Sequence, residues 1–338
     1  MTKGVYAFVH ERGVERKSSS GGAYLAVCLA LDKIAGETVI VYGAAFDHKL
    51  HVVHERAETH GKRERFCQSK YVRSDMRGIY SRIQKDLQEG KYVLFTGTPC
   101  QNDAVKKYCT RKNIPMDRLY LMDIICHGAP GPELWEKYKK WMETKYGSPL
   151  TQFSFRYKGS RWQPYSVKAV FQNGRVLMNT FDARLYTKLF VTGLPLPEGC
   201  FHCPYANLER PSDLTIGDFW GIRRVMPRFP HRRGVSEVLI NTQKGEKIWE
   251  TVMETAWNNP EIRLEECLTK DYQKYQHNLN LPTPKPSGTE AFRRDLKERD
   301  FEFLSKKYGG NNWKGKSVHC VKRVLGELGI LAMLKRIL

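Results

Sequence analysis

The chain has 338 residues, of which 41% are hydrophobic and 12% aromatic, and its formal net charge is +20. This composition excludes a disordered chain, and no apolar run reaches the roughly 18 residues of a membrane-spanning helix. The positive charge could attract nucleic acid, anionic lipid or a phosphorylated small molecule. The basic residues are scattered, without a helix-turn-helix, zinc-finger or RNP-type pattern, so we expect no specific nucleic-acid partner.

The first part of the chain, residues 1–148, alternates between two kinds of pattern. Helix-like segments are predicted at 24–31, 79–87 and 103–109, and strand-like runs at 39–46, 92–97 and 119–125. Strands that alternate with helices in this order predict βαβ units. We therefore expect an α/β fold whose sheet is mixed and mostly parallel, with flanking helices.

From residue 149 the pattern changes to short alternating strands. They are predicted at 153–157, 166–171 and 176–178, with Asn173-Gly174 as a hairpin turn, and a strand and turn at 213–221, a strand at 238–241 and a helix at 247–257 follow. These segments predict an antiparallel β insertion, and we treat 149–280 as one β-rich region.

A proline-rich linker at 281–286 opens the last region, residues 281–338. Its final segment, 321–338, has apolar residues at helical spacing and basic residues around them. Such a segment could make a peripheral contact with an anionic membrane or dock as an ordinary helix.

Four of the nine cysteines stand in short, distinctive settings: Cys100 in Gly-Thr-Pro-Cys-Gln, Cys126 in Cys-His-Gly, and the Cys-x-x-Cys pair of Cys200 and Cys203. Cys100 and Cys126 each follow a predicted strand, at the sheet edge where open α/β folds bind ligands, so we expect them to be neighbours. Four thiolates suit a cubane iron–sulfur cluster or a closed zinc site. From spacing alone, unrelated buried thiols remain the alternative.

The remaining cysteines are irregularly spaced, and the start of the chain has no apolar signal segment. Both features predict a reducing cytoplasmic location and argue against a disulfide scaffold.

Two further segments could bind an anionic group. The run Ser18-Ser19-Ser20-Gly21-Gly22 precedes a predicted helix, whose free amides could cradle a phosphate. Gln68-Ser69-Lys70-Tyr71 offers a cation and an aromatic ring. Neither contains a dinucleotide-fold or P-loop motif, and both patterns also occur in ordinary loops.

Two histidines lie within the cysteine motifs, His127 and His202. Either could donate a hydrogen bond to a cluster sulfur or relay a proton, and a purely structural role is the alternative.

The order of these motifs resembles that of the beta-subunit family of coenzyme F-420 hydrogenases and dehydrogenases, over roughly residues 5–250. The matching segments are 18–22, 42–46, 68–72, 97–101, 126–128, 155–158, 200–203 and 213–221. The resemblance implies a flavoprotein that carries one [4Fe–4S] cluster beside FAD. Region 1–148 would then bind the flavin, and region 149–280 would complete the cluster site.

Carried over by motif, the resemblance implies a specific set of site residues. Cys100, Cys126, Cys200 and Cys203 would bind the cluster; Ser19, Ser20, Gly21, Gly22, Ser69, Lys70, Tyr71, Gly97 and Thr98 would line the flavin; Lys158 and His127 would act in catalysis, and Arg156 could contact flavin or a charged substrate. The implied activity is electron transfer between the cluster and an organic substrate through FAD. An anionic small-molecule substrate would suit the basic chain.

The chain departs from many relatives in two respects. It lacks the Cys-x-x-Cys-x-x-Cys runs of a ferredoxin-like domain, and Glu198-Gly199 precedes Cys200 where many relatives have an arginine. We therefore expect an external electron donor, such as a ferredoxin or a redox partner subunit. The alternatives are a zinc-stabilised basic binding protein and a cofactor-poor scaffold subunit of a redox complex.

Overall fold

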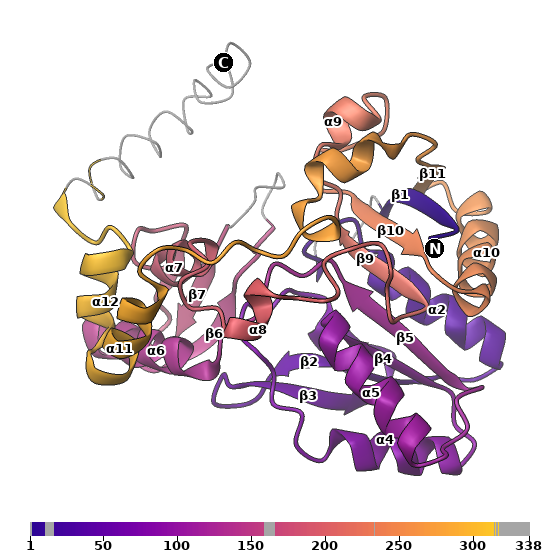
Figure 1. Cartoon of the computed structure of the whole chain (residues 1–338), viewed down its shortest axis with the longest axis horizontal. Helices are drawn as coiled ribbons and strands as arrows, with labels where there is room; N and C mark the ends of the chain where they lie inside the picture. Colours follow the sequence, from indigo (N-terminus) through magenta and orange to yellow (C-terminus); the bar gives the residue numbers. More distant parts are fainter. Residues whose placement is uncertain are drawn as a thin grey trace.

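The computed structural model describes residues 2–10, 17–158, 166–232, 234–313, 315 and 317. In these residues the strands form two sheets: a large one of eight strands in the order β11-β1-β10-β9-β5-β4-β2-β3, and a small one of three in the order β6-β7-β8 (Figure 1). The large sheet comprises β1 (Gly4–His10), β2 (Ile40–Phe46), β3 (Val52–Ala57), β4 (Val93–Gly97), β5 (Leu119–Ile124), β9 (Leu214–Asp218), β10 (Ser236–Ile240) and β11 (Ile262–Glu266). The small sheet comprises β6 (Leu150–Ser154), β7 (Lys168–Phe171) and β8 (Val176–Met178).

The strands of the large sheet end mostly at one edge. β9, β5, β4 and β2 are adjacent and parallel, and β1 runs the same way because it is antiparallel to β10, which is antiparallel to β9. We call the edge where these strands end the carboxyl edge. The small sheet is antiparallel throughout. The predicted fold class, a mixed, mostly parallel sheet with flanking helices and an antiparallel insertion, is confirmed.

Helices cover both faces of the large sheet. α2 (Ala23–Ala35) and α10 (Gln243–Trp257) pack on one face, and α4 (Ile79–Gln88) and α5 (Pro99–Arg111) on the other. Successive strand residues alternate between the two cores, so that Val41 lies with α2 and Tyr42 with α4. Burial on both faces explains why these strands read as nearly continuous apolar runs.

A second body packs around the small sheet, and Figure 1 shows it beside the large sheet. Its helices are α6 (Pro132–Tyr146), α7 (Leu185–Val191), α11 (Thr289–Glu298) and α12 (Phe301–Tyr308). They enclose an aromatic core that includes Trp135, Tyr138, Phe155 and Tyr186. Sequence patterns did not resolve α11 and α12, and the basic helix expected at 321–338 lies outside the described residues.

The other helical elements of the described residues are short, three to six residues each. They are α3 (His60–Arg63), α8 (Glu198–Phe201), α9 (Ile222–Val225), η1 (Glu64–Phe66), η2 (Lys270–Tyr275) and η3 (His277–Leu279).

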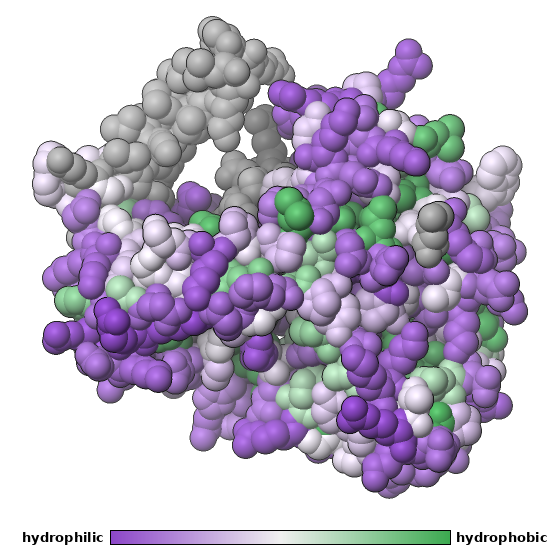
Figure 2. All heavy atoms as spheres, in the orientation of Figure 1, coloured by the Kyte–Doolittle hydropathy of each residue, from purple (hydrophilic) through white to green (hydrophobic). Residues whose placement is uncertain are grey.

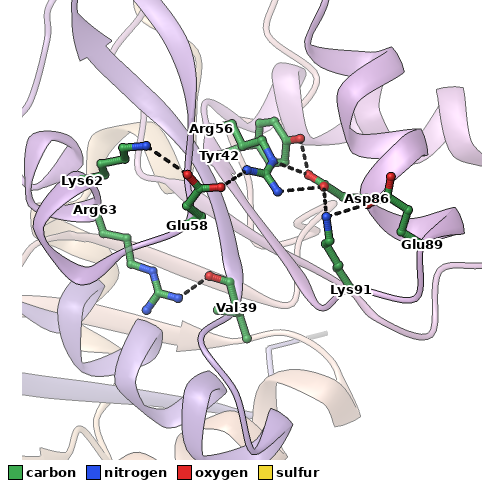
Figure 3. A network of polar contacts seen from close by, with 9 residues as sticks. All are labelled: Val39, Tyr42, Arg56, Glu58, Lys62, Arg63, Asp86, Glu89 and Lys91. Carbon is green, nitrogen blue, oxygen red and sulfur yellow. Dashed lines mark hydrogen bonds and ion pairs between the residues drawn. The ribbon is translucent and has the colours of Figure 1, made fainter.

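A polar network fixes α4 to the strands beneath it (Figure 3). The buried Asp86 carboxylate accepts hydrogen bonds from the Tyr42 hydroxyl at 2.6 Å and from the Arg56 guanidinium at 2.8 and 3.0 Å. In the same region Arg63, with 1% of its side chain exposed, pairs with Asp32 at 2.7 Å. Both buried charges therefore face a group of opposite charge, as buried charges generally do.

The face of the molecule seen in Figure 2 is largely polar. Hydrophilic residues predominate on the face shown in Figure 2, with apolar residues scattered among them. Of the helices that the structure describes, none combines the length and the apolar character needed to cross a membrane.

Candidate metal and cofactor site

Three chain segments bring thiols together at the carboxyl edge. Cys100 follows β4, Cys126 follows β5, and Cys200 and Cys203 lie on and just after α8, which Figure 1 shows between the two sheets. Burial raises the pKa of the Cys126 thiol to about 12, and the thiols of Cys100, Cys200 and Cys203 add to that rise. All four cysteines singled out in the sequence are therefore neighbours, although three segments far apart in the chain supply them.

Cys100 is the exposed member of the group. It lies in the first turn of α5, where Thr98 and Gln101 form a capping box and Pro99 is the first helical residue. The Thr98 hydroxyl lies 3.1 Å from the Cys100 sulfur.

The predicted start of this helix, residue 103, was wrong by four residues. Thr98 and Pro99 are a preferred N-cap and a preferred first helical residue, so the helix begins before Cys100 and the cysteine is not in a loop.

Backbone amides point at two of the other sulfurs. The Gly128 N–H lowers the pKa of Cys126 and the Ala129 N–H that of Cys200, in each case against the larger effect of burial. The Arg73 guanidinium also favours the Cys200 thiolate. Gly128 has φ 130°, and a side chain there would collide with Leu196, so this loop requires glycine.

The thiols fit a metal group by their chemistry. The described cysteines form no disulfide, and sulfur ligands select zinc or iron–sulfur groups. Within the described ranges, no three or more His, Cys, Asp or Glu side chains are arranged to hold a metal ion as they stand.

The predicted cofactor loops also meet at the carboxyl edge. The Ser69 N–H donates to the Ser19 hydroxyl at 2.9 Å, and Lys158 Nζ donates to the Ser20 carbonyl at 2.5 Å. Gly21 is pressed against β1 and β10, where a Cβ atom would collide with the Phe8 carbonyl. The loop thus needs glycine for close approach of backbones.

A buried ion pair connects the small sheet to this edge. Arg156, just after β6, pairs with Asp218 at the end of β9 at 2.7 Å and donates to the Tyr71 hydroxyl at 3.0 Å. Only 5% of the Arg156 side chain and 12% of the Asp218 side chain are exposed. The Tyr71 ring stacks on Phe190 with centroids 4.4 Å apart, so one of its faces is already covered.

The other candidate residues lie around these two groups. Gly97 and Thr98 end β4 beside Cys100. The Lys70 ammonium donates to the Arg65 carbonyl at 2.6 Å, and burial lowers its pKa to about 7. Gly22 is the N-cap residue of α2, with φ 97°.

The two histidines differ. His127 packs edge-on against Phe190, and burial lowers its pKa although a hydrogen bond with Asn278 opposes the shift. His202 has 73% of its side chain exposed. His127 is therefore the one enclosed by the site.

Sequence reasoning missed Arg210 and Asp123, which form a buried ion pair at 2.8 Å; Asp123 is three residues before Cys126, and Arg210 is seven residues after Cys203. A cavity of about 300 Å³ adjoins them, lined by residues that include Tyr205, Arg210 and Asn241. The sequence offered one signal for Arg210, which is its place in the short loop between the Cys-x-x-Cys pair and the strand predicted at 213–221.

Comparisons with known proteins identify a family and similar solved structures. A family model that describes the C-terminal part of the coenzyme F420 hydrogenase/dehydrogenase beta subunit matches residues 90–259, just over half of the 338 residues. The structure is similar to a chain of the F420-reducing [NiFe] hydrogenase complex from Methanosarcina barkeri, studied by xenon derivatization, with a TM-score of 0.52 and 16% identity over 90% of this chain and 91% of that one. At this identity the likeness concerns the fold alone.

No curated protein matches the sequence. The family match spans β4 to α10 and so contains all four clustered cysteines. The chain belongs to the coenzyme F420 hydrogenase/dehydrogenase beta subunit family.

Proposed function

We propose that this chain is an iron–sulfur flavoprotein oxidoreductase that passes electrons between one [4Fe–4S] cluster and an organic substrate through FAD. The observation that carries the proposal is the convergence of four thiols at the carboxyl edge, next to loops that contact each other there. Family membership supports an oxidoreductase role.

In this proposal Cys100, Cys126, Cys200 and Cys203 hold the cluster. The chain supplies backbone amide donors to two of the sulfurs, from Gly128 to Cys126 and from Ala129 to Cys200, and the Thr98 hydroxyl lies 3.1 Å from the Cys100 sulfur. Donors and positive charge near the sulfurs stabilise the more negative, reduced form of such a group.

The segments 19–22, 69–71 and 97–98 line the proposed FAD site. FAD would supply the conversion between one-electron and hydride chemistry. Lys158 lies at this site through its hydrogen bond to Ser20, where its charge would orient an anionic substrate. His127, neutral because its pKa is lowered by burial, is the proposed proton donor or acceptor.

The electron donor is proposed to be external, either a ferredoxin or a partner subunit. The hydrogenase to which the structure is similar is described as a complex, which supports a partner subunit. The proposed location is the reducing cytoplasm, where thiols stay available for ligation.

The test is anaerobic purification followed by absorbance spectroscopy and analysis of iron, sulfide, zinc and flavin. We expect about four irons and four sulfides per chain, with a flavin band that is lost on removal of FAD. Zinc alone, with no flavin binding after reconstitution, would contradict the proposal and favour the zinc-stabilised binding protein.

A further inference from the structure

Arg210 connects two of the segments that carry the thiols. Its side chain is 1% exposed, and that of Asp123, its partner at 2.8 Å, is fully buried. The guanidinium also donates to the Tyr205 carbonyl at 2.5 Å, the Ile124 carbonyl at 3.0 Å and the Thr215 hydroxyl at 3.2 Å. One planar group therefore makes contacts to three separate stretches of the chain.

Two of these partners are close in sequence to the cysteines of the site. Ile124 is two residues before Cys126, and Tyr205 is two residues after Cys203. Asp123 and Ile124 belong to the carboxyl end of β5, whereas Tyr205 belongs to the loop after α8. The guanidinium thus fixes the distance between the Cys126 segment and the Cys203 segment.

We propose that Arg210 is a positioning residue for the four-thiol site: it holds the Cys203 loop on the end of β5, so that the thiols are already gathered before a metal group binds. This inference rests on the proposed function for the identity of that group. The contacts need a planar guanidinium, because its donors point in several fixed directions at once, and a lysine ammonium cannot reproduce them.

The chain offers a matched control in Arg63. It is also 1% exposed, pairs with Asp32 at 2.7 Å and donates to the backbone carbonyl of Val39 (Figure 3). Its partners lie on α2 and just before β2, and neither belongs to the thiol segments. Arg63→Lys therefore removes the same kind of buried contact without touching the site.

The experiment compares the wild type, Arg210→Lys and Arg63→Lys, with Asp123→Asn as a second variant that releases the same guanidinium. Each protein is checked for folding by circular dichroism and then reconstituted anaerobically with iron and sulfide. In parallel, the metal-free proteins are treated with iodoacetamide, and the alkylation rate of Cys203 is followed by mass spectrometry.

We expect Arg210→Lys and Asp123→Asn to bind the iron–sulfur group about 10-fold more weakly, and their Cys203 to be alkylated faster than in the wild type. Arg63→Lys should match the wild type in iron–sulfur binding and in the alkylation rate of Cys203. Equal iron loading and equal Cys203 reactivity in the Arg210 and Arg63 variants would overturn the proposal. If the wild type loads no iron but only the Arg210 and Asp123 variants expose Cys203, the proposed function fails while the positioning role stands.

Discussion

At the scale of single residues, the site combines groups whose charge depends on their surroundings. Burial raises the pKa of Cys126, whereas amide donors act in the opposite direction. Lys70 lies in the proposed cofactor loops with its pKa lowered to about 7. Asp86 is remote from the site, and its carboxylate accepts hydrogen bonds from Tyr42 and Arg56.

Lys70 predicts a pH dependence of FAD binding. If its ammonium pairs with a phosphate of FAD, affinity is highest where Lys70 is charged and weakens as pH rises through about 7. We expect the dissociation constant to increase about 10-fold across that range, the value of one charged hydrogen bond. Fluorescence titration of FAD measures it. Lys70→Met should remove the pH dependence and exposed Lys62→Met should keep it; a wild type without pH dependence would exclude this role.

The same pKa has a consequence for the free protein. The unfolded chain holds the Lys70 proton up to about pH 10.5, whereas the folded chain releases it near 7. The unfolded state therefore binds more protons between these values, and the Lys70 contribution makes the fold more stable as pH rises through that window.

Asp86 predicts a second effect on stability, which depends on its carboxylate charge. Burial would raise the pKa of Asp86, but hydrogen bonds from Arg56 and Tyr42 outweigh it and lower the pKa below 3.8. Asp86→Asn removes the buried carboxylate that accepts from Arg56, whose remaining ion pair is with Glu58 at 2.6 Å, and should reduce the free energy of unfolding by about 2 kcal/mol at pH 7. Urea unfolding measures it, with the exposed Glu89→Gln as a control that should match the wild type.

The difference between wild type and Asp86→Asn also depends on pH. Because the folded pKa is depressed, the Asp86 contribution is complete above pH 3.8 and is lost as pH falls through the folded value. A difference that stayed constant at acid pH would show that the carboxylate charge is not responsible.

At the scale of elements, the C-terminal helices belong to the second body and are not a loose tail. Phe301 on α12 is 1% exposed and packs against Tyr138 and Trp141 of α6, with ring centroids 5.1 and 5.3 Å away. Residues 281–288 lead to these helices past the site, where Thr283 donates to the His127 carbonyl at 2.6 Å. Docking of α12 therefore also holds the segment that contacts His127.

Phe301→Ala should accordingly be strongly destabilising. We expect a loss of about 3–4 kcal/mol, because a large aromatic side chain leaves a cavity in a packed core. Phe303, two residues along the same helix, is 37% exposed, and Phe303→Ala should cost no more than about 0.5 kcal/mol. Guanidinium unfolding distinguishes the two; equal effects would mean that α12 does not dock as described.

At the scale of the whole molecule, the positive net charge of the chain and the exposure of Cys100 favour an acidic electron donor. The net charge is +20, and the thiol group reaches the surface at Cys100. Long-range attraction would raise the rate at which an acidic carrier protein meets this face, without requiring any specific contact. The effect must then disappear as salt screens the charges.

Reduction by an acidic ferredoxin should therefore depend steeply on salt. Raising the ionic strength from about 0.01 to about 0.1 M shortens the screening length from about 30 to about 10 Å, and we expect the second-order rate constant to fall about 10-fold. Stopped-flow absorbance measures it, with the cationic methyl viologen radical as control, whose rate should not fall. A ferredoxin rate independent of salt would rule out electrostatic steering.

Local patterns in the sequence determined the elements and the candidate chemistry. Apolar runs identified the central parallel strands, Asn173-Gly174 marked the β7–β8 hairpin, and four cysteines in short motifs indicated a metal group. These features are readable because side-chain period and turn preference act between near neighbours. The start of α5 was misjudged because the Thr98–Pro99 cap was not recognised as a helix start.

Only the tertiary structure decided how these parts meet. β5 pairs with β9 across about ninety intervening residues, which brings Cys126 beside Cys200 and Cys203, and no local pattern specifies that pairing. The Arg210–Asp123 and Arg156–Asp218 pairs likewise join residues 87 and 62 positions apart. Such contacts depend on which strands are adjacent in the sheet. The packing of helices on both sheet faces decides that order, and this packing involves the whole folded chain.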